Sequence, residues 1–247
     1  MRRAAQLLAA HRPVSMYMWN GVAQHTNATQ TGRAISSLYG LLGDIDRPGG
    51  NVDFPFVGLK PVGGREFLSE GAGAERIGLE MKPIDSPSRP GHCAADVYTV
   101  ILEGCPYPIK ALLNFGTNTI MSNGDSSRGR EAFRALDFAV AAEFFMTPTA
   151  ELCAYVLPAT SFLEMANLTA GARHRPDART RLQYRPAVVE PPAERRSDTW
   201  IIFELGRRLG LGDRFRNGDI EAAYAYELTP TGITLEELKA APGGITV

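Results

Sequence analysis

The sequence lacks the closely spaced ligands of a metal centre. It has three cysteines, Cys93, Cys105 and Cys153, and no two of them form a C-x-x-C pair. Because zinc and iron–sulfur sites are held by closely spaced cysteines, neither site is expected within this chain. An odd cysteine count without a framework also excludes a disulfide scaffold. His92 beside Cys93 lies in a stretch rich in proline, glycine and serine, where a loop histidine is a better interpretation than a metal ligand.

The chain also lacks the common phosphate-binding and hydrolase motifs. It contains no G-x-x-x-x-G-K-S/T phosphate loop and no G-x-S-x-G nucleophile elbow. Gly71 and Gly73 begin like a G-x-G-x-x-G fingerprint, but Arg76 stands where the third glycine belongs and no strand precedes the run. A nicotinamide-dependent dehydrogenase is therefore a weak hypothesis.

Neither a strong charge imbalance nor a long apolar run is present. The 247 residues carry a net charge of -1, with 44% hydrophobic and 21% charged residues. This composition is ordinary for a globular protein and suggests no nucleic-acid partner and no membrane insertion. The N-terminal run MRRAAQLLAAHRP is better explained by an amphipathic helix than by a signal peptide, because its apolar patch is short and no A-x-A site follows. The compartment is not indicated.

What the sequence does contain is a central stretch, Ile109–Thr160, in which apolar runs alternate with helical patterns. Strands are expected at Ile109–Phe115, Phe138–Ala142 and Tyr155–Leu157, and helices at Ser126–Leu136 and from Thr147 onward. This alternation predicts an α/β fold: an open, mostly parallel, Rossmann-like sheet with flanking helices. Ligands of such sheets bind outside the carboxyl ends of the strands. Those ends are Asn114–Asn118, Glu143–Thr147 and Pro158–Glu164.

The flanking regions add further expected elements. On the N-terminal side we expect a helix over residues 2–11, a strand at Val14–Trp19, a polar loop, and a helix over Thr29–Leu42 started by Asn27. The loop faces a helix N-terminus, which suits an anionic ligand, although an ordinary capped crossover is the better explanation of the spacing alone. Residues 52–108 show no sustained periodicity.

On the C-terminal side an edge strand is expected over Leu182–Val189, and Ser197 is expected to cap a helix. From Arg173 to Arg216 there are eleven arginines and six acidic residues. Contact with a pyrophosphate or partner and a solvated surface explain this excess equally well. Short helices are expected at Asp219–Tyr226 and Leu235–Ala240.

Several runs of residues resemble the molybdopterin oxidoreductase family, the dimethyl-sulfoxide-reductase type that binds two molybdopterin guanine dinucleotides. They appear in order over nearly the whole chain. They are WNGVAQH from Trp19, LGDIDRPGGN from Leu42, LNFGTN from Leu113, FMTPTA from Phe145, VLPA from Val156, VEPP from Val189, RSDTW from Arg196 and RRLG from Arg207.

The resemblance implies an internal fragment of a larger catalytic subunit, which would be a molybdenum- or tungsten-dependent oxidoreductase. The fragment alone would be inactive. An iron–sulfur cluster would belong only to the missing upstream part. The implied partners are the remaining domains of the subunit and an iron–sulfur electron-transfer subunit. The implied division is residues 1–50 as the end of one α/β cofactor-binding domain, 51–108 as an irregular connection, 109–212 as the dinucleotide-binding core and 213–247 as a helical tail.

The resemblance also implies a set of cofactor-binding residues and no catalytic or metal-ligating residue within this segment. Asn20, Gly21 and Gln24 match loop positions that approach the pterin. Asn118 matches an asparagine near the guanine nucleotide, although Thr119 replaces the usual proline. Ala142 and Glu143 match a pair that reaches the guanosine, and Asp198 matches an acidic residue set against the nucleotide. A carboxylate suits guanine, because it can accept the N1–H and N2–H bonds together.

Some positions depart from the family pattern. Met165 stands where the family often has a lysine that touches the cofactor, and Cys153-Ala154-Tyr155 replaces the usual Ala-Asp-Val. These departures keep an alternative open: a cofactor-free structural homologue that acts as a subunit scaffold.

Overall fold

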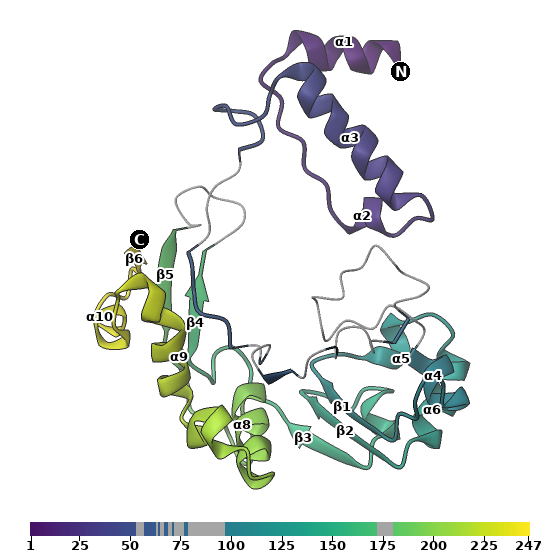
Figure 1. Ribbon diagram of the computed structural model, residues 1–247, viewed down its shortest axis with the longest axis vertical. Helices are drawn as coiled ribbons and strands as arrows, with labels where there is room; N and C mark the ends of the chain where they lie inside the picture. The colour runs from purple at the N-terminus through teal and green to yellow at the C-terminus, as the bar shows by residue number, and fades with distance from the viewer. Residues whose placement is uncertain are drawn as a thin grey trace. The chain divides into compact units, whose positions relative to one another are not determined.

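The computed structural model describes residues 1–52, 57–62, 64, 67–68, 71, 77–78, 97–171 and 180–247 (Figure 1). The chain divides into two compact units. Unit 1 is Met1–Phe56 with Ala172–Arg179, and unit 2 is Val57–Gly171 with Thr180–Val247. His92, Cys93, residues 72–76 and residues 173–179, which entered the sequence predictions, lie outside the described residues. No helix in the described part of the chain is long and apolar enough to cross a membrane.

Unit 1 is helical in its described residues. Its helices are α1 (Arg2–Ala10), α2 (Asn20–Ala23) and α3 (Ala28–Leu42). The two longer helices confirm the predicted ones, and α3 ends at Gly43, whose φ of 65° is the left-handed conformation that glycine adopts readily. Asn27 occupies the N-cap position of α3 without a side-chain capping bond. The short helix α2 lies where only a loop was expected.

The predicted strand at Val14–Trp19 is wrong. The segment has no strand assignment, because its backbone groups bond to side chains rather than to a neighbouring strand. The Val14 N–H donates to Asp44 Oδ2 at 3.0 Å, and the Met16 N–H and C=O both bond to the Asn51 side chain at 2.9 Å. Asp44 is buried and also pairs with Arg12 at 3.2 Å.

Unit 2 contains the predicted parallel sheet. Strands β1 (Ala111–Phe115), β2 (Phe138–Glu143) and β3 (Tyr155–Pro158) are parallel and lie in the order β1-β2-β3. Helices α4 (Val97–Glu103), α5 (Thr119–Ser122) and α6 (Ser126–Ala135) accompany it. The core between sheet and helices comprises Tyr98, Ile101, Ile120, Ala132, Phe133 and Ala139. The α/β prediction is therefore confirmed.

The helix predicted from Thr147 is mostly absent. Only a 3₁₀ turn, η2 (Ala150–Leu152), forms there. The Ala154 N–H already bonds to the Ala139 carbonyl oxygen at 2.8 Å. Since the chain must rejoin the sheet at Ala154, there is room for one turn and no more.

The rest of unit 2 is built on a second sheet that the sequence patterns did not predict. Strands β4 (Asn167–Ala170), β5 (Arg181–Arg185) and β6 (Ile245–Thr246) pair antiparallel in that order. Strand β5 confirms the first half of the strand expected over Leu182–Val189 and ends just before Pro186. Helices α8 (Asp198–Arg208), α9 (Ile220–Leu228) and α10 (Leu235–Lys239) follow, with 3₁₀ segments η3 (Gly212–Gly218) and η4 (Thr229–Thr231).

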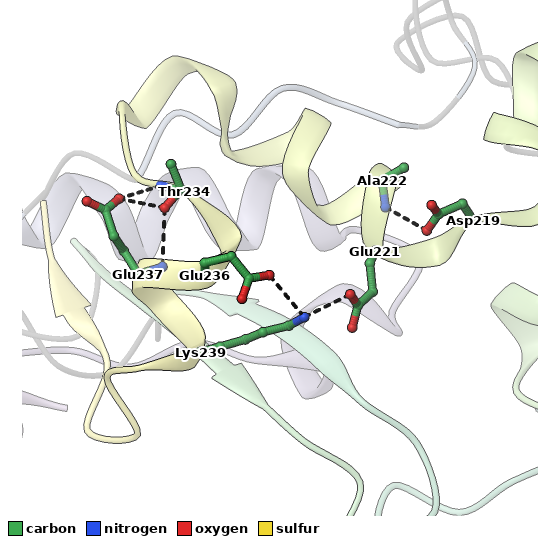
Figure 2. A network of polar contacts seen from close by, with 7 residues as sticks. All are labelled: Asp219, Glu221, Ala222, Thr234, Glu236, Glu237 and Lys239. Carbon is green, nitrogen blue, oxygen red and sulfur yellow. Dashed lines mark hydrogen bonds and ion pairs between the residues drawn. The ribbon is translucent and has the colours of Figure 1, made fainter.

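Polar contacts fix the two C-terminal helices beside this sheet (Figure 2). Thr234 and Glu237 form a reciprocal capping box that starts α10. The Lys239 Nζ at its end lies 2.8 Å from Glu221 Oε2 on α9, so the ion pair links the two helices. Beneath them the buried leucines Leu182, Leu228, Leu235 and Leu238 form the second core.

We expect Gly129→Ala to destabilise unit 2 although alanine favours helices. A β-carbon at Gly129 of α6 would lie 2.8 Å from Tyr98 Cζ and 3.0 Å from Ile120 Cδ1. Overpacking of this kind costs about 1–3 kcal/mol. The matched control is Gly40→Ala in α3, where nothing lies within 4 Å of the added carbon, so that stability should rise by about 1 kcal/mol. Hydrogen exchange in each unit measures both, and slower exchange around α6 in G129A would contradict the packing argument.

Candidate functional site

The candidate site of unit 2 lies at the carboxyl edge of the parallel sheet. The register pairs Phe115 with Ala142 and Glu143 with Pro158, so the three strands end side by side. Two of the predicted residues emerge there directly. Asn118 is at the N-cap of α5 after β1, and Glu143 is the last residue of β2.

A third predicted residue, Asp198, is brought to this edge by a short backbone pairing. Arg196 forms a parallel bridge with Ala159: the Arg196 N–H bonds to the Pro158 carbonyl and the Thr160 N–H to the Arg196 carbonyl, both at 3.1 Å. Ser197 then caps α8 by accepting the Trp200 N–H at 3.1 Å, as the sequence predicts. Asp198 is the first residue of that helix, directly after the strand-like pairing.

Asp198 and Glu143 are electrostatic neighbours. Burial raises the pKa of Asp198, and the negative charge of Glu143 raises this pKa further. The Glu143 carboxylate accepts the Phe144 N–H at 2.8 Å. Within the described ranges neither carboxylate has an ion-pair partner. Two like charges without a cation between them favour a ligand that brings hydrogen-bond donors.

The loop that carries Asn118 is fixed from several sides. The buried Asn114 donates from Nδ2 to the Thr117 carbonyl at 2.6 Å and accepts the Thr119 hydroxyl at 2.7 Å. The Tyr98 hydroxyl, from α4, donates to the Thr119 carbonyl at 3.0 Å. Gly116, with φ of 56°, allows the chain to leave the strand. The position of this loop is therefore set by the sheet and by α4.

The Asn118 side chain is held by one buried hydroxyl. Thr149, 0% exposed, donates to Asn118 Oδ1 at 2.8 Å and accepts the Ile120 N–H at 3.0 Å. Ala142, the remaining predicted residue of this unit, has a buried side chain, and its carbonyl accepts the Gly116 N–H at 3.1 Å. Ala142 thus supports the loop through its backbone.

A cavity of about 250 Å³ lies beside the start of α8. Its lining residues are Thr160, Glu164, Met165, Ala166, Tyr184, Pro191, Arg195, Arg196, Ser197, Thr199, Trp200, Ile220, Glu221 and Tyr224. The buried Thr160 hydroxyl has no hydrogen-bond partner among the described residues. Glu164 accepts the Ser161 N–H and pairs with Arg195 at 2.9 Å, and these contacts lower its pKa. Met165 also lines this cavity.

The predicted residues of unit 1 lie around α2. Asn20 begins this helix and Gln24 is its C-cap; both are exposed, as is Gly21. Asn20 lines an open groove of about 600 Å³ together with Met18, Trp19, Val22, Ala23, Ala28, Thr29 and Gly32. A common role of these residues with those of unit 2 stays a prediction. The described residues contain no group of three or more histidine, cysteine, aspartate or glutamate side chains that could hold a metal ion.

The sequence patterns missed the residues that hold the loop: Tyr98, Asn114 and Thr149. Only Asn114 carried a signal, since it is a polar residue inside an otherwise apolar strand. A buried asparagine needs partners, and the nearest available ones are in the following loop. Thr149 and Tyr98 are distant in sequence, so no local pattern marks them.

Comparisons with known proteins agree on one family. The family model described as "Molybdopterin oxidoreductase" matches residues 4–208. The chain is 29% identical over 234 residues to the probable oxidoreductase YyaE of Bacillus subtilis, covering 94% of this chain and 33% of that protein. It is 26% identical over 262 residues to acetylene hydratase of Syntrophotalea acetylenica, covering 96% of this chain and 35% of that protein.

A solved structure shows the same fold. The acetylene hydratase from Pelobacter acetylenicus matches with a TM-score of 0.79 and 25% identity, over 97% of this chain and 36% of that one. The chain thus spans about a third of the length of these relatives.

We expect Glu143→Gln to raise stability at neutral pH and to have little effect in acid. The pKa of Asp198 is raised in the folded state, so its charged form opposes folding once the pH rises through that pKa. Removing the Glu143 charge lessens this cost, whereas glutamine can still accept the Phe144 N–H. Unfolding midpoints between pH 3.8 and 7 measure the effect. Glu151→Gln, an exposed glutamate on η2, is the control; an equal gain there would show that net charge alone is responsible.

Proposed function

The chain belongs to the molybdopterin oxidoreductase family, and we propose that it supplies part of the molybdopterin guanine dinucleotide site of a larger molybdenum or tungsten oxidoreductase subunit. The observation that carries the proposal is the pair of neighbouring carboxylates, Glu143 and Asp198, at the carboxyl edge of the parallel sheet. This edge is where open α/β sheets bind nucleotides.

The hydrogen-bonding character of these side chains supports a guanine nucleotide as the ligand. The two carboxylates offer acceptors only, and guanine carries the N1–H and N2–H donors that one carboxylate accepts together. Asn118 lies after the neighbouring strand and adds a polar side chain to the same edge. The bound metal and its pterin dithiolenes would supply the redox chemistry, while these residues would hold and orient the nucleotide tail.

For unit 1 the proposal is that residues around α2 approach a pterin. Asn20, Gly21 and Gln24 are exposed around α2, and Asn20 borders an open groove. The activity, substrate and partner subunits of the whole protein are part of the proposal, since the chain spans about a third of its relatives. One of those relatives is named a hydratase, so family membership by itself does not fix the reaction.

The alternative, a cofactor-free scaffold, is supported by one observation. Met165 lines the cavity beside α8, at the position of the family lysine. A lysine lost from a cofactor contact is compatible with a fold kept only for subunit contacts. Elemental analysis and nucleotide extraction of the native protein distinguish the two: stoichiometric Mo or W with released GMP supports the first function, and neither of them supports the scaffold.

We expect Asp198→Asn to reduce the GMP released per protein by about 10- to 100-fold. The substitution removes a charge-assisted acceptor and presents N–H donors to the donors of guanine, a loss of about 1.5–3 kcal/mol. Asp213→Asn, at an exposed aspartate in η3, should leave the GMP content unchanged. Extraction from the holoprotein, produced in a host that makes the cofactor, measures both. If D198N retained the wild-type GMP content, Asp198 would not be a nucleotide-binding residue.

A further inference from the structure

We propose that Thr149 is a positioning residue that makes Asn118 a hydrogen-bond donor toward the ligand, so that the ligand must present an acceptor atom to the loop after β1. The inference rests on the proposed function and deepens it: beyond the acceptors at Glu143 and Asp198, the guanine base meets a donor at Asn118 whose orientation Thr149 fixes.

The argument begins with the hydrogen of the Thr149 hydroxyl. Thr149 is 0% exposed, and its Oγ1 accepts the Ile120 N–H at 3.0 Å. The hydroxyl hydrogen therefore needs an acceptor inside the protein, and the Asn118 side chain is the neighbour at 2.8 Å. If the amide were turned over, its NH2 group and the Ile120 N–H would both point at Oγ1. The hydroxyl hydrogen would then lose its acceptor in a place without water. The buried hydroxyl thus selects one orientation of an otherwise ambiguous amide.

The carbonyl oxygen of Asn118 is already engaged: it accepts the N–H groups of Met121 and Ser122, both at 2.9 Å, and the Ser122 hydroxyl at 3.0 Å. With Oδ1 held by Thr149, the side-chain NH2 group and the backbone N–H of Asn118 have no hydrogen-bond partner among the described residues. Because Asn118 is only half-buried, the side-chain NH2 group is available to a ligand. Asn118 therefore presents donors to a ligand, while its two oxygens are held within the protein.

The neighbouring strand end has the opposite character. Glu143 and Asp198 are carboxylates, which accept hydrogen bonds when ionised. Because the two negative charges lie near each other, a ligand that donates hydrogen bonds to them is favoured. A ligand that satisfies both sides needs an acceptor next to N–H donors. Guanine, the 2-amino-6-oxopurine, has this order, with O6 and N7 as acceptors and N1–H and the 2-amino group as donors. A 6-aminopurine reverses it at N6 and N1, and a phosphate offers no donor to the carboxylates.

The test uses the holoprotein with its cofactor and four variants, two at asparagines and two at Thr149. Asn118→Asp keeps the shape and an oxygen for the Thr149 hydroxyl, but presents an acceptor in place of the donor. We expect its content of extractable GMP to fall at least tenfold, with the unfolding midpoint of the apoprotein close to that of wild type. Asn123→Asp is the control for the added charge, because Asn123 is an exposed residue just after α5; its GMP content should not change.

Thr149 itself is tested by two substitutions. Thr149→Val removes the hydroxyl while keeping the branched shape, so the Asn118 amide can turn over. GMP content should fall about fivefold or more and should recover in Thr149→Ser. A purely structural role would lower the unfolding midpoint of T149V without lowering GMP content per folded protein, and that result would overturn the inference.

The outcomes separate the inference from the function on which it rests. Full GMP content in N118D refutes the donor role of Asn118 and leaves the proposed function standing. Wild-type holoprotein that releases neither GMP nor metal refutes the proposed function, and the inference falls with it. Loss of GMP in N118D and T149V, with retention in N123D and T149S, supports both.

Discussion

Parallel pairing of β1, β2 and β3 is the constraint on which the candidate site of unit 2 depends. Strands that run in the same direction and in register finish at a common edge, so residues 15 or 27 positions apart in the sequence become neighbours. The parallel bridge between Ala159 and Arg196 adds one more short segment beside the end of β3 and places the start of α8 at the same edge. If the register shifted by one residue, the side chains of each strand would change faces and the loop contacts would be lost.

The site is electrostatically unfavourable in the protein alone. Partial burial and like charge both raise the pKa of Asp198, so the folded chain holds a charge that it would hold more easily unfolded. Some other carboxylates of unit 2 are matched by cations: Glu204 accepts from Arg207 and Arg208, which lowers its pKa to about 2, and Glu221 pairs with Lys239. Glu143 and Asp198 instead lie near each other without an ion-pair partner among the described residues. Such an arrangement is typical of a place where a ligand completes the contacts.

The sequence predicted the parallel sheet because its strands are short apolar runs set between helical patterns. The strands β1, β2 and β3 lie where these runs occur. It failed where backbone groups bond to side chains, as at Val14 and Met16, since a β-prone run without a partner strand forms no ladder. It also missed the antiparallel sheet, whose short strands come from segments separated by loops. The roles of Asn20, Gly21, Gln24, Asn118, Ala142, Glu143 and Asp198 rest on family resemblance, because side-chain chemistry at a strand end has no periodic signal.

The loop after β1 has one more consequence, for protein engineering. Its shape is determined by Asn114 from the strand, Tyr98 from an earlier helix and Thr149 from a later turn. If residues 116–118 were grafted into another parallel sheet, the graft would transfer the sequence of this loop but not its conformation. A change of nucleotide preference would require changes at all three of these residues together. Substitutions within the loop alone are therefore not expected to produce a new ligand preference.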